Sequence, residues 1–247
     1  MSDSTAPRPG GVPAPLPANE PERLVAVRSY GILDSLPETV YDDLVFLASM
    51  ICETPIALVS IVDEKRQFLK ANVGLPVTET SRDVAFCAHA ILEPEPLVVP
   101  DASADPRFAG NPLVTGHPDI RFYAGVPLVN PDGLALGTLC AIDTKPRELT
   151  ETQQRGLAAL ARQVMVQLEL RRAILDLESS LAARAETGPM GRTPPPVMLD
   201  ARATAERARQ LLGQSPPGGA MEDRIRGLLA RLESLQPAVA KRRVDND

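Results

Sequence analysis

The stretch IRFYAGVPLVNPDGLALGTLCAID, Ile120–Asp143, predicts two strands joined by a tight turn. Residues 120–129 are rich in the β-branched and aromatic side chains that favour strands. Asn130–Gly133 has the composition of a turn, because proline presets φ and glycine takes a positive φ at little cost. Leu134–Ile142 is apolar on both alternating faces, so we expect it to lie centrally in a sheet that is covered on both sides. Small residues indicate that a helix or a ligand packs closely against this strand: Ala135, Gly137 and Ala141.

Composition limits the class of protein. A chain of 247 residues has room for one domain of about 150 residues with extensions. The net charge of −6 and the pI of about 5.1 argue against nucleic-acid binding, which depends on basic contacts to phosphates. No apolar run reaches the roughly 18 residues that span a bilayer, so no membrane association is expected. The start of the chain lacks the apolar region of a secretory signal, and the three cysteines are far apart in sequence, which favours a cytoplasmic protein without disulfides.

The chain before this hairpin contains most of the other predicted elements. These are, in order, a disordered proline-rich tail, two helices, a strand hairpin, a short apolar helix and a further strand: residues 1–19, 19–30, 38–53, 56–62, 67–73, 84–92 and 97–99. In the second helix, a 3.6-residue repeat predicts the side that faces the core: Val40, Leu44, Leu47 and Ile51. Residues 101–118 lack periodicity, and a loop of this length is typical of a segment that covers a binding site.

A long helix is predicted from about residue 151 to 184, with Thr150 as its N-cap. Its second half extends beyond a compact domain and carries apolar residues at heptad spacing. This pattern predicts a homodimer through a short coiled coil formed by Leu170, Ile174, Leu177 and Leu181. The alternative is a solvated, frayed helix, because two heptads are short.

The last part of the chain is predicted to be a linker, residues 188–198, and an amphipathic helical tail, residues 199–247. A weak helix is expected at 199–212. In the helix that follows it, a 4-3-4-3 spacing produces an apolar seam: Met221, Ile225, Leu228, Leu232 and Leu235. This seam docks on the first domain, pairs with its own copy or binds a partner protein, and the sequence leaves these three alternatives open.

Several segments carry a family resemblance: YGILDSLPETVYDDL, PIALVSIVDEKRQFLKANVGL, AFCAHAI, LVVPDASADPRFAGNPLV, IRFYAGVPL and GLALGTLCAIDTKPREL. Together they are similar to a GAF domain of the subgroup found at the N-terminus of bacterial sensor histidine kinases and diguanylate cyclases. The resemblance covers about residues 20–172 and implies an α+β fold with a six-stranded antiparallel sheet flanked by helices. Residues 173–187 would then extend the long C-terminal signalling helix. The resemblance also implies a pocket between the sheet and the segment 84–122, with the ligand or cofactor left unknown.

A set of polar and aromatic residues around the covering loop is predicted to bind the ligand: His89, Arg107, Phe108, Asn111, Arg121 and Tyr123. Arginine suits carboxylate or phosphate, while asparagine and tyrosine orient a small polar group, so an anionic metabolite is the expected ligand. The alternative is that these residues anchor the loop, with Arg107 paired to Asp101 or Asp105.

The sequence favours a sensory or regulatory GAF module of bacterial signal transduction that is not an enzyme, in which the state of the pocket shifts the long helix. No histidine follows residue 117, and no ATP lid, GGDEF signature, catalytic triad or metal-ligand spacing is seen, so we expect no attached output enzyme, no catalytic residue and no metal. One alternative is a thiol-dependent reductase of the free methionine sulfoxide reductase type, with Cys87 and Cys140 as redox candidates. Another is a ligand-free adaptor that acts through the C-terminal helix.

Overall fold

The computed structural model describes residues 11–187, 206, 209–210 and 220–234. The chain forms two compact units, Met1–Met165 and Val166–Asp247. The predicted linker at 188–198 lies outside the described residues, as do the start of the predicted N-terminal tail and most of the weak helix.

The first unit is built on a six-stranded sheet with the strand order β3-β2-β1-β6-β5-β4. Every neighbouring pair is antiparallel, which confirms the predicted α+β fold and the six-stranded sheet. The strands are β1 (Ile56–Val62), β2 (Arg66–Val73), β3 (Glu79–Ser81), β4 (Leu97–Val99), β5 (Phe122–Val129) and β6 (Ala135–Asp143).

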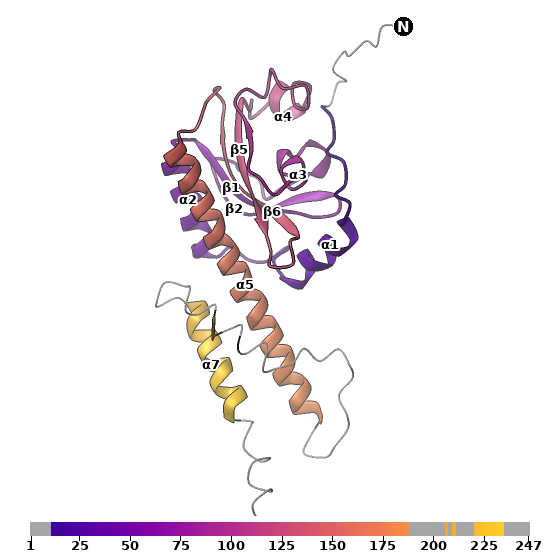
Figure 1. Ribbon diagram of the computed structural model, residues 1–247, viewed down its shortest axis with the longest axis vertical. Helices are drawn as coiled ribbons and strands as arrows, with labels where there is room; N and C mark the ends of the chain where they lie inside the picture. Colours follow the sequence, from indigo (N-terminus) through magenta and orange to yellow (C-terminus); the bar gives the residue numbers. More distant parts are fainter. Residues whose placement is uncertain (1–10, 188–205, 207–208, 211–219, 235–247) are drawn as a thin grey trace, which may run out of the picture. The chain divides into compact units, whose positions relative to one another are not determined.

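Helices cover both faces of this sheet (Figure 1). The helices of the first unit are α1 (Glu20–Ser29), α2 (Thr39–Cys52), α3 (Phe86–Ala90), α4 (Pro112–Thr115) and the first part of α5 (Glu151–Thr187). On one face α2 packs on β1, β2 and β6, and α5 is joined to it by a hydrogen bond of 3.1 Å from Gln153 Nε2 to the Ile51 carbonyl. On the other face α3 packs on β1, β5 and β6, so that face carries the segment predicted to cover a pocket.

The strand predicted to be central is central, because β6 lies between β1 and β5. A Cβ on Gly137 would lie 1.9 Å from the carbonyl oxygen of Ser60 in β1. The neighbour that requires this glycine is therefore the adjacent strand, and not the helix or ligand that the small residues suggested. In the β5–β6 turn, Gly133 has a φ of 79°, as the turn composition predicts.

Helix α2 buries only part of the apolar side that was predicted to face the core: Leu44 is buried as predicted. Its buried residues are Tyr41, Leu44, Val45, Ala48 and Cys52. Leu47 and Ile51, predicted to face the core, are 44% and 37% exposed. The prediction was wrong here because α2 carries two apolar stripes, and periodicity alone does not say which one meets the sheet.

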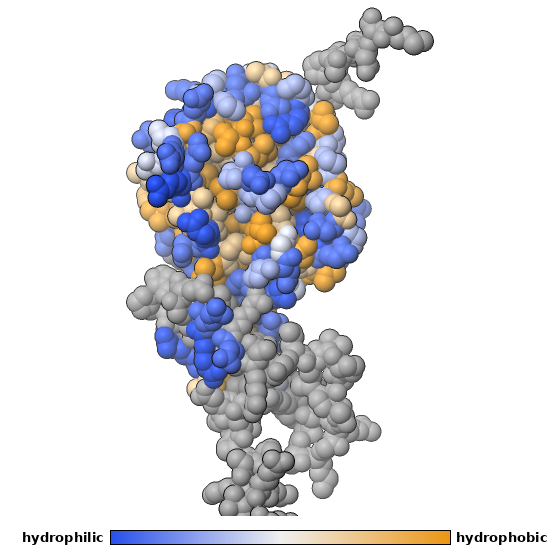
Figure 2. Space-filling view, viewed as in Figure 1, coloured by the Kyte–Doolittle hydropathy of each residue, from blue (hydrophilic) through white to orange (hydrophobic). Residues whose placement is uncertain are grey.

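On the side seen in Figure 2, apolar residues lie in separate groups between hydrophilic ones.

Short elements were also missed. The residues between the predicted strand 67–73 and the predicted helix 84–92 contain β3, for which no element was predicted. In place of the single helix predicted at 84–92, the chain forms a 3₁₀ turn, η1 (Arg82–Val84), followed by α3. The covering loop contains α4, which Asn111 caps by accepting a hydrogen bond of 2.9 Å from the Leu113 amide. Elements of three to five residues have too few positions to display a period, so only their caps signal them.

The second unit contains the remainder of α5 and helix α7 (Ala220–Ser234). The apolar contact between them is formed by Leu170, Ala173, Ile174, Leu177, Leu181, Ile225, Leu228 and Leu229. The α5 residues predicted to form a homodimer seam therefore pack against α7 of the same chain, and the homodimer stays a prediction. The side chains of Met221 and Leu232, and the whole of Leu235, lie outside the described residues.

Across the part of the chain that is described, no helix combines the length and the apolar character needed to cross a bilayer.

Candidate functional site

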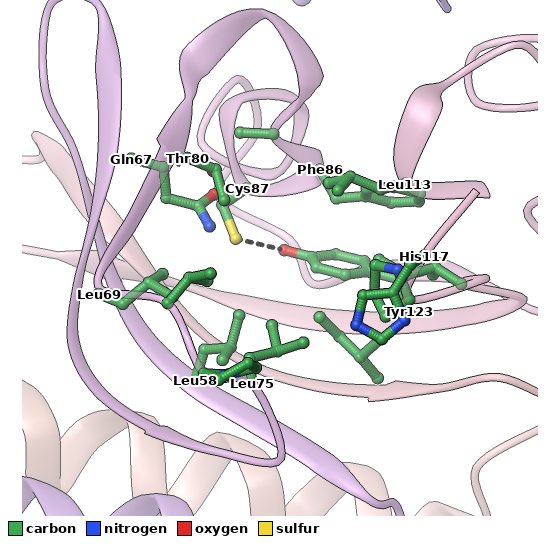
Figure 3. A pocket seen from close by; sticks show the side chains of 16 residues that line it. Leu58, Gln67, Leu69, Leu75, Thr80, Phe86, Cys87, Leu113, His117 and Tyr123 are labelled. Carbon is green, nitrogen blue, oxygen red and sulfur yellow. Dashed lines mark hydrogen bonds between the residues drawn. The ribbon is translucent and has the colours of Figure 1, made fainter. Parts of the chain in front are cut away.

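A pocket of about 160 Å³ lies between the sheet and the segments that cover it (Figure 3). Its lining consists of Leu58, Gln67, Leu69, Leu75, Pro76, Val77, Thr80, Ala85, Phe86, Cys87, Leu113, His117, Pro118, Ile120, Tyr123 and Ile142. Alternate residues of β1, β2, β5 and β6 form the floor, because side chains of a strand point to opposite faces in turn. The residues before β3, the start of α3 and the segment 113–120 form the cover.

The cover is held in place by contacts around Asn111 and Phe108. Asn111 Nδ2 donates a hydrogen bond of 3.0 Å to the Val84 carbonyl and so joins the two covering segments. The Phe108 ring stacks on Phe86, with ring centroids 4.0 Å apart. These two predicted ligand residues shape the pocket from behind its lining and do not themselves line it.

Two polar side chains of the lining have no hydrogen-bond partner for a buried atom. These atoms are Gln67 Oε1 and Thr80 Oγ1. Gln67 is 5% exposed, and it stands directly opposite Thr80 in the β2–β3 register. Figure 3 draws the Gln67 amide and the Cys87 thiol on the same side of the pocket, with His117 on the opposite side. Buried polar atoms are normally paired. These two atoms have no partner within the protein, so they mark a place where a ligand or a water molecule can supply one.

Cys87 belongs to a buried polar network beneath α3. Its Sγ accepts a hydrogen bond of 3.4 Å from the Tyr123 hydroxyl and lies 3.9 Å from Cys140 Sγ. Burial by itself raises the pKa of the Cys87 thiol, but hydrogen bonds from Cys140, Ser60, Thr138 and Tyr123 act in the opposite direction and lower this pKa below its usual value. Burial and the neighbouring Cys87 raise the pKa of Cys140 well above its usual value. The two redox candidates are thus in contact, while the reductase activity stays a prediction.

Tyr123 is the one predicted ligand residue that lines the pocket. It is fully buried, and its hydroxyl occupies space that only a glycine at position 125 leaves free, since a Cβ there would lie 2.1 Å away. Burial, followed by the nearby Cys87 and Cys140, raises the pKa of Tyr123 well above its usual value. The hydroxyl therefore stays protonated and acts as a hydrogen-bond donor to Cys87.

The two predicted arginines are paired within their own loops. Arg107 binds Asp105 with two hydrogen bonds of 3.0 Å and 2.6 Å, the geometry of the anchoring alternative. Arg121 donates to the Val114 carbonyl at 2.9 Å and to Asp119 at 3.1 Å. Neither guanidinium lines the pocket, so the positive charge expected to receive an anion is absent from its lining.

His89 and Arg107 instead line a shallower groove together with residues 12, 13 and 15 of the N-terminal segment. The Val12 amide donates to the Arg107 carbonyl at 3.2 Å, and His89 Nε2 lies 3.0 Å from the Val12 carbonyl. Burial and the charge of Arg107 lower the pKa of His89. The contact with Val12 and the charge of Asp105 act in the opposite direction, and the net result is a lowered pKa. His89 thus contacts a backbone carbonyl of the N-terminal segment and does not line the pocket.

The polar lining residues Gln67 and Thr80 and the covering residues 75–77 were not predicted from the sequence. A signal for Gln67 was present, because it lies on the same face of β2 as Leu69, two residues further along the strand. A polar residue at the end of an apolar face is typical of a buried site. Thr80 carried no comparable signal, since β3 has only three residues.

The floor of the pocket continues directly into α5. Ile142 lines the pocket, and the next residue, Asp143, pairs with Arg147. Thr150 and Gln153 then form a capping box, in which Thr150 Oγ1 accepts from the Gln153 amide at 3.3 Å and Gln153 Oε1 accepts from the Thr150 amide at 3.0 Å. This chain of short-range contacts ties the start of α5 to the pocket floor.

Among the described residues, no cluster of three or more histidine, cysteine, aspartate or glutamate side chains is arranged to hold a metal ion.

Comparison with curated proteins finds a cyclic di-GMP phosphodiesterase of Pseudomonas aeruginosa that is 43% identical over 155 residues. The match covers 62% of this chain and 26% of that relative, so the chain spans about a quarter of the relative's length. Among solved structures, the GAF domain of an Acinetobacter phosphoenolpyruvate-protein phosphotransferase is 18% identical, with a TM-score of 0.44 over 66% of this chain and 98% of that one. The free methionine-R-sulfoxide reductase of Neisseria meningitidis is 20% identical, with a TM-score of 0.45 over 62% of this chain and 89% of that one.

A protein-family model described as "GAF domain" matches residues 36–168, which is more than half of the chain. The match contains all six strands, the covering segments and the first part of α5. The chain therefore belongs to the GAF domain family.

Proposed function

We propose that this chain is a sensory or regulatory module of bacterial signal transduction, in which a small molecule in the pocket alters helix α5. The observation that carries the proposal is the pocket itself, with two unpaired polar atoms on its wall and a floor strand that runs into α5. The relative from Pseudomonas aeruginosa supports a signalling role, because the matching region belongs to a cyclic di-GMP phosphodiesterase. The module acts in the cytoplasm and has no catalytic activity of its own.

Coupling follows from a difference in ligand affinity between two arrangements of the first unit. A ligand shifts an equilibrium only as far as it prefers one arrangement over the other. The cover contributes most of the lining, and two of its segments are joined through Asn111 and Phe108, so occupation of the pocket acts on these segments together. A ligand also contacts Ile142 of β6. A displacement of this residue acts, through the neighbouring Asp143–Arg147 ion pair, on the segment that leads to the start of α5.

A variant that fills the pocket tests this proposal without knowledge of the ligand. Ala85 lines the pocket and is 3% exposed, so Ala85→Leu places a larger side chain in the ligand's position. We expect hydrogen–deuterium exchange to change by about threefold to tenfold in residues 143–165, as expected for a shift of about 1 kcal/mol in local opening. The matched control is Ala104→Leu, at an exposed position of the covering loop.

Exchange that changes in α5 for Ala85→Leu but not for Ala104→Leu supports the proposal. Identical exchange in residues 143–165 for wild type and both variants, with Ala85→Leu folded, contradicts it.

A further inference from the structure

The pocket lining restricts the charge of a ligand. Its residues include no aspartate, glutamate, lysine or arginine. His117 is exposed, and Figure 3 places it on the side of the pocket away from Gln67. An ionised group inside the pocket would lose its hydration without gaining a partner of opposite charge, which is strongly unfavourable. The ligand that fits this lining is uncharged.

The polar atoms restrict the chemistry of one end of the ligand. Gln67 Oε1 accepts hydrogen bonds, and the Thr80 hydroxyl both donates and accepts. Their side chains are neighbours because the two residues are register partners in β2 and β3. A hydroxyl group satisfies both at once, since it donates to Gln67 and accepts from Thr80. Most of the remaining lining is aliphatic or aromatic, so the rest of the ligand is apolar.

The volume restricts the size. An apolar cavity of about 150 Å³ admits benzene, and the pocket here has about 160 Å³. This space fits one six-membered ring or a branched chain of similar bulk. A water molecule needs two to four polar partners, so water satisfies the polar end alone and leaves the apolar part unfilled. The exposed residues Pro76, Val77 and His117 at the margin of the lining leave a path from solvent.

We propose that the pocket binds a small uncharged molecule in which an apolar ring or branched chain carries one hydroxyl group, with the hydroxyl held by Gln67 and Thr80. This inference rests on the proposed function, because it names the ligand class of the same pocket. This ligand class differs from the anionic metabolite expected from sequence. The two arginines predicted to bind that anion, Arg107 and Arg121, are paired within their own loops.

Calorimetric titration of the full chain with three ligands of similar size tests the class. Phenol has the ring and the hydroxyl, toluene has the ring alone, and benzoate has the ring and a charge. We expect phenol to bind with a dissociation constant in the micromolar to millimolar range. Toluene should bind about tenfold more weakly, because one hydrogen bond to a buried group is lost, and benzoate should produce no binding heat.

Two variants assign the discrimination to the named residues. Gln67→Leu and Thr80→Val each keep the approximate side-chain size and remove the polar atom, so each should reduce the preference for phenol over toluene to less than about threefold. The control Thr152→Val, at an exposed position of α5, should leave the tenfold preference unchanged. If one of the two pocket variants does not fold, the other gives the answer by itself.

Equal affinity for phenol and toluene in the wild-type chain overturns the inference, as does a preference that survives both pocket variants. Binding of benzoate in place of phenol overturns the ligand class and leaves the sensory function standing. Absence of binding by all three ligands also overturns the class, and the exchange experiment on Ala85→Leu then tests the sensory function separately.

Discussion

Glu20 shows how one buried carboxylate connects the start of α1 to the end of the sheet. It accepts hydrogen bonds of 2.7 Å and 2.9 Å from Arg23 and one of 2.5 Å from Arg82. Arg23 is 1% exposed and also donates to the Val62 carbonyl at 2.7 Å. Burial raises the pKa of Glu20, but the hydrogen bonds and charges of Arg23 and Arg82 outweigh it and lower this pKa to about 2.

The low pKa of Glu20 makes the free energy of unfolding depend on pH. Because the folded pKa of Glu20 lies below its usual 4.5, the stabilisation is complete above pH 4.5 and is lost as the pH falls toward 2. We expect Glu20→Gln to lower the free energy of unfolding by about 2–3 kcal/mol at pH 7 and by less as the pH falls from 4.5 toward 2. Urea denaturation at pH 7 and at pH 3 measures both values. Glu22→Gln, at an exposed position of the same helix, is the control, and an equal loss for Glu20→Gln at both pH values would disprove the assignment.

At single residues, the sequence indicated which side chains have binding chemistry but not which of them are already paired. Arg107 and Arg121 have partners two residues away, Asp105 and Asp119, and a loop conformation unknown from sequence creates those pairs. Tyr123 could be predicted because it lies on the first strand of the hairpin beside the covering loop. Gln67 and Thr80 depend on the β2–β3 register, which a three-residue strand does not reveal in sequence.

Among the elements, the extension of α5 has a seam that α7 covers. Leu177 is fully buried in this contact, and Ile225 of α7 is equally buried. The heptad spacing of the seam predicted a homodimer, and the same apolar surface serves either partner, so the two contacts compete.

Removal of residues 188–247 should therefore expose the seam and increase self-association. We expect the truncated chain to be mainly dimeric at concentrations where the full chain is mainly monomeric, with a shift in the dissociation constant of at least about tenfold. Analytical ultracentrifugation measures this shift. Leu177→Ser in the truncated chain is the control and should restore the monomer. A truncated chain that stays as monomeric as the full chain would show that the seam does not dimerise.

The elements with clear periods were predicted within a few residues, as the β5–β6 hairpin and the long helix α5 demonstrate. The errors follow from physics that a local pattern does not contain. Helix α2 has two apolar stripes, and tertiary packing selects the one with Tyr41 and Val45. Strand β3 and helix α4 are too short to have a period, and α4 is recognisable only by its Asn111 cap and the proline that follows.

For the whole molecule, the resemblance to GAF domains supplied what no local pattern contains, namely the number of strands and the side of the sheet on which a pocket lies. The order β3-β2-β1-β6-β5-β4 places strands distant in sequence next to each other, and these pairings are not encoded in any one segment. The ligand class depends on how segments from the whole of the first unit meet, so it could be argued only from the structure.

If occupation of the pocket is transmitted to α5, a distance measured within one chain should change when the pocket is filled. Spin labels introduced as unnatural amino acids at the exposed positions Val98 and Ser179 report the position of α5 relative to the sheet by double electron–electron resonance. We expect saturating phenol to shift the distance distribution in the wild-type chain, and to shift it less in Gln67→Leu at the same phenol concentration. If calorimetry shows that phenol fills the pocket and the distance distribution stays unchanged, the pocket is not coupled to α5.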